Sequence, residues 1–76
     1  MKLPPLSARG VTKALSALGF EKKRQRGSHM IFRHPETKAT VIVPDHGNKE
    51  LKKGTLRNIV RQANVSVNEF VNATKK

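Results

Sequence analysis

Residues 27–34 read Gly-Ser-His-Met-Ile-Phe-Arg-His, and the fold of the chain can be worked out from this stretch. Its apolar centre favours a β-strand, with a glycine before it and a proline after it. Successive side chains of a strand point to opposite faces, so burial of Met30 and Phe32 would leave His29 and Arg33 on an open face. A titratable base beside a fixed cation is an arrangement that phosphodiester chemistry can use.

Two further strands are predicted on either side of the strand at 29–34. Residues 20–26 are mostly charged and fit an edge strand, where lysine and arginine discourage stray pairing. A turn at 35–38 leads into a third strand over 39–43, which Pro44 ends because proline cannot donate to the ladder. These segments predict a small antiparallel sheet.

Helices are predicted before and after the strands. Ser7 is placed to cap a helix over 8–18, and Gly19 follows it where a left-handed residue belongs. A second helix is expected over about 53–63. Ser66 begins a short last helix, with a glutamate at the spacing of a capping box.

The order helix, three antiparallel strands, helix and short helical tail predicts a two-layer α+β domain. Its helices would cover one sheet face and leave the other open to water or a partner. Double-stranded-RNA-binding domains have the same order, which is a fold analogy and not evidence of function. We expect one domain over residues 1–76, with a core of about 5–72.

The composition favours a polyanionic partner. Sixteen Lys and Arg residues against five Asp and Glu give a net charge of +11. Nucleic acid is the leading candidate and an anionic membrane surface the second, although no apolar run approaches the roughly 20 residues that span a bilayer. No cysteine is present, so disulfides and thiolate metal sites are excluded. We expect a cytoplasmic protein without cofactor or metal.

Five short motifs together resemble one family. They are Leu-Gly-Phe at 18–20, Gly-Ser-His at 27–29, Phe-Arg-His-Pro at 32–35, Val-Pro-Asp-His at 43–46 and Leu-Lys-Lys-Gly-Thr-Leu at 51–56. Their order and spacing resemble the HicA-type toxins, which are small mRNA interferases of toxin–antitoxin pairs. The resemblance covers about residues 5–72.

The resemblance implies an α-β-β-β-α fold like that of the double-stranded-RNA-binding domain. It also implies mRNA cleavage centred on His29 and neutralisation by a HicB antitoxin. One departure is Met30, where many members have a second histidine or an aromatic residue. We expect Met30 to face the core, so the departure should not affect catalysis.

His29 is the expected catalytic residue. RNA carries its own nucleophile, the 2′-hydroxyl, and histidine suits the proton transfer that activates it. Gly27 would allow close approach of the phosphate, and Ser28 could donate a hydrogen bond to it. His46 is the candidate for a second catalytic group, with a plain loop position as the alternative. His34 is expected to pack on the other sheet face.

Basic residues around the sheet and the second helix are expected to bind the RNA backbone. They are Arg24, Arg26, Arg33, Lys49, Lys52 and Lys53. The three lysines precede a helix N-terminus, whose amides also attract anions. The alternative is a solvated basic face that serves solubility alone.

Ile31 and Ile42 would both lie on the open sheet face. They could form the apolar centre of an antitoxin-binding patch, or they could be shielded by arginine stems. The leading function is therefore a metal-independent endoribonuclease toxin acting on mRNA. The main rival is a non-catalytic RNA-binding module of the same fold, and turnover would separate the two.

Overall fold

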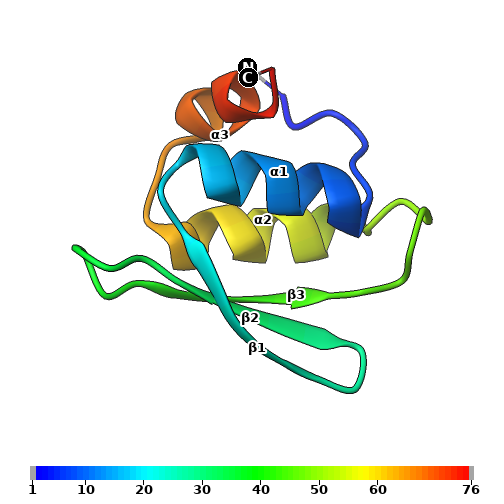
Figure 1. Cartoon of the computed structure of the whole chain (residues 1–76). Coiled ribbons are helices and arrows are strands. Elements are labelled where there is room, and N and C mark those ends of the chain that lie inside the picture. The colour runs from blue at the N-terminus through cyan, green and yellow to red at the C-terminus, as the bar shows by residue number, and fades with distance from the viewer. Residues whose placement is uncertain (1, 76) are drawn as a thin grey trace.

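The computed structural model describes residues 2–75, which form three helices and one three-stranded antiparallel sheet. In chain order the elements are α1 (Ala8–Ala17), β1 (Glu21–Arg26), β2 (His29–Arg33), β3 (Thr40–Pro44), α2 (Lys53–Ala63) and α3 (Val67–Thr74). The helices lie on one face of the sheet and leave the other face uncovered (Figure 1). The two-layer α+β fold predicted from the sequence is confirmed.

Helix α1 begins and ends close to the predicted positions. The side chain of Ser7 accepts a hydrogen bond from the Gly10 N–H at 3.4 Å. The helix ends one residue before the predicted position, and Gly19 then adopts a φ of 97°. Phe20 follows, and it is buried against the core.

The last two helices also match their sequence signals. α2 spans the predicted residues, and Asn64 after it is left-handed with a φ of 60°. Ser66 and Glu69 form the predicted capping box, each side chain accepting from the other's backbone N–H at 3.1 Å. None of the helices within residues 2–75 is long and apolar enough to cross a bilayer.

The sheet has the strand order β1-β2-β3, with β2 in the centre. Met30 and Phe32 face the helices and are buried, opposite buried residues of β3. β3 runs over 40–44 and not over the predicted 39–43, because Pro44 pairs with His29 as its last residue. Pro44 is tolerated there because β3 is an edge strand and alternate N–H groups of an edge strand point away from the sheet.

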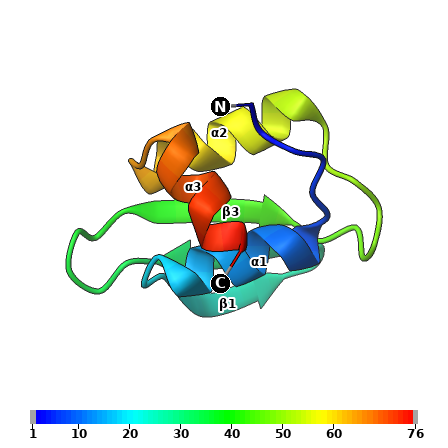
Figure 2. The ribbon, with the colours of Figure 1, turned by 90° about the horizontal axis from the view of Figure 1, so that it is seen from above.

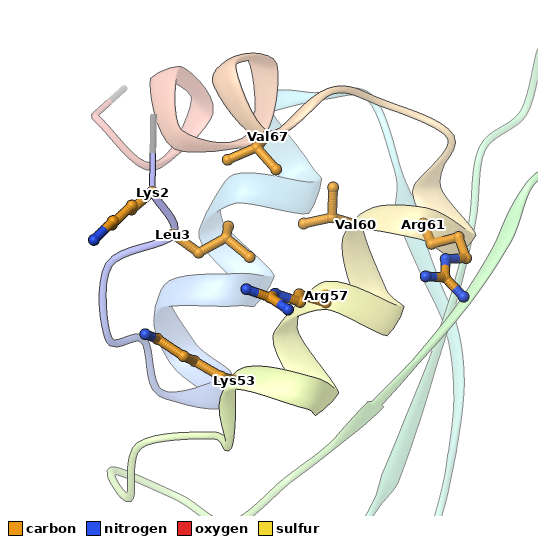
Figure 3. Close-up of a pocket in the computed structure, with 7 residues that line it drawn as sticks. All are labelled: Lys2, Leu3, Lys53, Arg57, Val60, Arg61 and Val67. Carbon is orange, nitrogen blue, oxygen red and sulfur yellow. The ribbon is translucent and has the colours of Figure 1, made fainter.

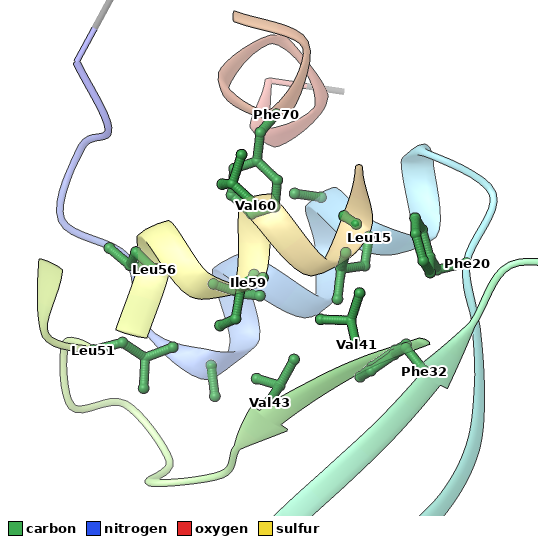
Figure 4. Packing of buried hydrophobic residues seen from close by; sticks show 14 of the residues in the cluster. Leu15, Phe20, Phe32, Val41, Val43, Leu51, Leu56, Ile59, Val60 and Phe70 are labelled. Carbon is green, nitrogen blue, oxygen red and sulfur yellow. The ribbon is translucent and has the colours of Figure 1, made fainter. Parts of the chain in front are cut away.

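The core fills the space between the sheet and the helices (Figure 4). Its largest fully buried side chains are Phe32, Phe70, Leu15, Leu56, Ile59, Val11, Val41 and Val43. They come from every element except β1, whose six residues are all exposed. β1 is therefore held by its pairing to β2, and both of its faces remain accessible.

Viewed from above, the helices cross over the sheet, with α3 lying over α1 (Figure 2). The segment before α1 is tied to the loop before α2, because the Leu51 N–H donates to the Leu6 carbonyl at 2.8 Å. This bond holds the β3–α2 loop, which carries several of the predicted site residues.

Candidate functional site

His29 stands at the first position of β2, on the face that the helices leave uncovered. Its cross-strand neighbours are Arg26 of β1 and Pro44 of β3. Side chains at such paired positions have Cβ atoms about 4.5–5.5 Å apart. The imidazole is exposed, so a solvent-borne phosphate could reach it with the Arg26 guanidinium alongside.

Two hydrogen bonds hold the turn before His29 in place. Gly27 has a φ of 58°, which explains the glycine, and a Cβ there would meet no atom within 4 Å. The carbonyl of Ser28 accepts from the Asp45 N–H at 2.5 Å, and the Gln25 side-chain amide donates to the Gly27 carbonyl at 3.1 Å. These bonds fix the turn while its outer side stays open to a ligand.

His46 lies in the loop after β3 and is exposed. It lines an open hollow of about 320 Å³. The other lining residues are Pro44, Lys49, Glu50, Leu51, Lys52 and Thr55. Since Pro44 is also the direct neighbour of His29, the hollow brings His46, Lys49 and Lys52 to the same end of the sheet as His29.

The N-terminus of α2 opens beside this hollow. Its N-cap residue, Lys52, makes no side-chain cap hydrogen bond, and the first turn holds no acidic residue. The first amides of the helix therefore keep their donors and their share of positive helix dipole for an anion. Lys53 does not line this hollow, because its side chain borders a different one on the far side of α2.

Arg24 and Arg33 also lie on the uncovered face, further along the strands from His29. They line a hollow of about 400 Å³ together with Lys23, Ile31 and Thr40. Lys23 was not among the predicted site residues, because a β-bulge between Lys22 and Arg24 breaks the alternation of β1. No pattern in six polar residues signals a bulge.

The two isoleucines pair directly across β2 and β3 on this face. Ile42 is 47% exposed, the only large hydrophobic side chain among residues 2–75 with that degree of exposure, and Ile31 is half-buried. An apolar centre surrounded by cations is thus present where the sequence placed it. Its burial by a partner remains a prediction.

His34 lies away from His29, after the opposite end of β2. Its Nδ1 accepts from the N–H groups of Glu36 and Thr37 at 3.1 and 3.2 Å. Its ring meets the Phe20 ring edge-on, with centroids 5.2 Å apart. The contacts of His34 are those of a packing residue, as the sequence reading favoured.

The family model described as "HicA toxin of bacterial toxin-antitoxin" matches residues 8–65, which is more than half of the 76 residues. The match contains α1, the whole sheet and α2, and with them all the site residues named above. No curated protein matches the chain.

Proposed function

The chain belongs to the HicA toxins of bacterial toxin–antitoxin systems, and from this we propose that it is an endoribonuclease that cleaves mRNA in the cytoplasm without a metal ion. One observation carries the proposal: an exposed histidine, His29, stands beside Arg26 on a sheet face that the helices within residues 2–75 leave uncovered. A base and a cation at adjacent positions are what strand scission by the RNA's own 2′-hydroxyl requires.

In the proposed reaction His29 takes the proton of the 2′-hydroxyl as that oxygen attacks the adjacent phosphorus. The bond from phosphorus to the 5′-oxygen breaks, and the products are a 2′,3′-cyclic phosphate and a 5′-hydroxyl. Arg26 faces the extra negative charge on the transition state. His46 is the proposed group that returns a proton to the leaving oxygen, and Ser28 and the backbone at Gly27 approach the phosphate.

The RNA backbone is proposed to run from the sheet to the N-terminus of α2. Lys49 and Lys52 border the hollow next to Pro44 and lie on this path, whereas the side chain of Lys53 borders the hollow on the far side of α2 and is left out of it. Arg24 and Arg33 extend the basic surface along the strands. Contacts of this kind fix the position of the RNA and read little of its sequence.

The test compares the purified chain with its His29→Ala variant on a long single-stranded RNA in EDTA, with cleavage and binding measured together. Loss of a general base should reduce the cleavage rate by roughly 10²–10⁴-fold and leave binding nearly unchanged. A DNA strand of the same sequence is the control, since it lacks the 2′-hydroxyl and should be bound without being cut.

If both proteins bind RNA and neither cleaves it, the chain is a binding module and the catalytic proposal is withdrawn. If EDTA abolishes cleavage, a metal is needed and the role of His29 must be reassigned. The same assay on His46→Ala distinguishes a second catalytic group from a simple substrate contact, because only the former lowers the rate at saturating RNA.

A toxin of this family has a cognate antitoxin, and we propose that a HicB-like protein covers the uncovered sheet face over His29. The pair Ile31 and Ile42 would form the apolar centre of that contact, with the surrounding cations meeting an acidic rim.

Ile42→Lys should abolish the complex with the antitoxin, because it puts a charge at the centre of the buried patch. The side chain is already about half exposed, so the fold should persist. Ser16→Lys on the exposed side of α1 adds the same charge elsewhere and serves as the control. Co-purification of both variants with the antitoxin measures the effect, and retention by Ile42→Lys would move the interface to another surface.

A further inference from the structure

A second basic hollow lies in the helical layer, away from the uncovered sheet face (Figure 3). The segment before α1, the side of α2 and the start of α3 enclose it. Its volume is about 510 Å³, within the roughly 300–1,000 Å³ typical of ligand clefts. The lining residues are Lys2, Leu3, Lys53, Arg57, Val60, Arg61 and Val67.

The hollow combines an aliphatic floor with a cationic rim. Leu3, Val60 and Val67 converge in its middle, one from each of the three enclosing segments (Figure 3). The other four lining residues are all lysine or arginine, and none of the described residues that line it is acidic. An occupant that fits it must bring negative charge and a small apolar group together.

The cations of α2 have a regular spacing. Lys53, Arg57 and Arg61 follow one another at intervals of four residues, which is a rise of about 6 Å per step along the helix. Lys53 and Arg57 point to the same side, whereas the side chain of Arg61 is turned toward the strands at the end of the hollow (Figure 3). Carboxylates on alternate residues of an extended peptide are about 6.6–6.8 Å apart. The two spacings match closely enough for successive ion pairs.

The cationic rim and the aliphatic floor together favour one class of occupant over the others. A second copy of the chain would bring a further net charge of +11 to a cationic surface. Single-stranded nucleic acid would bring phosphates to the rim, but it offers no aliphatic side chain to fill the floor between Leu3, Val60 and Val67. An aliphatic side chain with acidic neighbours satisfies both the floor and the rim.

We propose that this hollow docks an acidic segment of a partner protein, with one aliphatic side chain of the segment seated between Leu3, Val60 and Val67. The site is separate from the sheet face and does not depend on RNA cleavage. A partner that carries such a segment would bind the helical side of the molecule, whether or not it also contacts His29.

The probe is a short fluorescent peptide of alternating glutamate and serine with one central leucine, titrated into the full chain by anisotropy. Arg57→Glu/Arg61→Glu should weaken binding by about tenfold or more, because two favourable charge pairs become repulsive. Replacing the leucine of the peptide by serine should weaken binding to the wild-type chain by about tenfold, because the floor is then left unfilled.

The matched control is Lys13→Glu/Lys75→Glu, which makes the same change in net charge at exposed positions outside the hollow. It should bind the peptide nearly as well as the wild type, and circular dichroism checks that both variants are folded. Equal weakening by both double variants would mean unspecific attraction and overturn the site. The proposal is also overturned if the peptide does not bind the wild-type chain. It is overturned as well if Arg57→Glu/Arg61→Glu loses affinity for single-stranded RNA, titrated in the same way, and keeps its affinity for the peptide.

Discussion

Gly19 and His34 are far apart in sequence and in close contact in the fold. A Cβ on Gly19 would lie 2.8 Å from Nε2 of His34, and the residue has a φ of 97°. The imidazole cannot move away freely, because its Nδ1 is held by two backbone N–H groups and its ring packs against Phe20. Both the backbone conformation and the space require glycine here.

Gly19→Ala should therefore lower the free energy of unfolding by about 1–3 kcal/mol, from left-handed strain together with the clash. Urea denaturation measures it. Gly54→Ala is the control, because a Cβ at Gly54 meets no atom within 4 Å and alanine favours the helix. An equal loss in the two variants would show that the contact with His34 is unimportant.

At the residue scale the sequence predicted the features that depend on residues close by in the sequence. The left-handed Gly19 and the face of His29 both follow from local pattern, and both are confirmed. The pairing of Gly19 with the imidazole of His34 could not be predicted, because it arises only when the end of α1 and the end of β2 meet. The same holds for the hydrogen bond between Asp45 and Ser28.

β3 is an edge strand, and a helix protects its edge. The N–H of Ile42 points away from β2 and donates to the side-chain oxygen of Gln62 on α2 at 2.9 Å. Two residues later Pro44 has no N–H to offer. The outer edge of β3 therefore offers few free donors to a stray strand.

Gln62→Ala should make the Ile42 amide exchange with solvent about fivefold faster, which corresponds to the roughly 1 kcal/mol of one hydrogen bond. Hydrogen exchange followed by NMR reads this single amide. Gln62→Glu keeps an acceptor oxygen at the same reach and should leave the exchange rate almost unchanged. Unchanged exchange in Gln62→Ala would mean that solvent replaces the bond without cost.

At the element scale the sequence located every helix and strand to within about one residue, since each has clear start or stop residues. It could not locate the bulge in β1. Strict alternation would put Lys22 on the uncovered face with Arg24, whereas the bulge turns Lys22 toward the helical side and brings Lys23 into the hollow beside Ile31. Without buried side chains, β1 carries no pattern that fixes its register.

At the scale of the whole molecule, the net charge of +11 is largely unneutralised. Within residues 2–75 one ion pair forms, between Lys23 and Glu21 at 3.0 Å. The remaining cations spread over the uncovered face, the end of the sheet near His29 and the hollow on α2. Charge alone, which the sequence gives directly, therefore predicts a polyanionic partner but does not say which surface meets it.

Salt dependence separates these surfaces. If RNA contacts four or five phosphates, the logarithm of its affinity for the chain should fall with the logarithm of salt concentration at a slope of about −3. Lys49→Gln/Lys52→Gln should reduce the slope by about 1.4, because each lost phosphate contact removes roughly 0.7. Lys52 makes no capping hydrogen bond through its side chain, so the helix should be unaffected.

Lys13→Gln/Lys75→Gln removes the same two charges from exposed positions outside the proposed RNA path and should leave the slope near −3. The net charge is equal in the two double variants. A difference between their slopes therefore measures the number of local phosphate contacts and not long-range attraction. Equal slopes in the two variants would place the RNA away from the α2 N-terminus. A slope near zero for the wild-type chain would mean that RNA binds without phosphate contacts, which contradicts the proposed path.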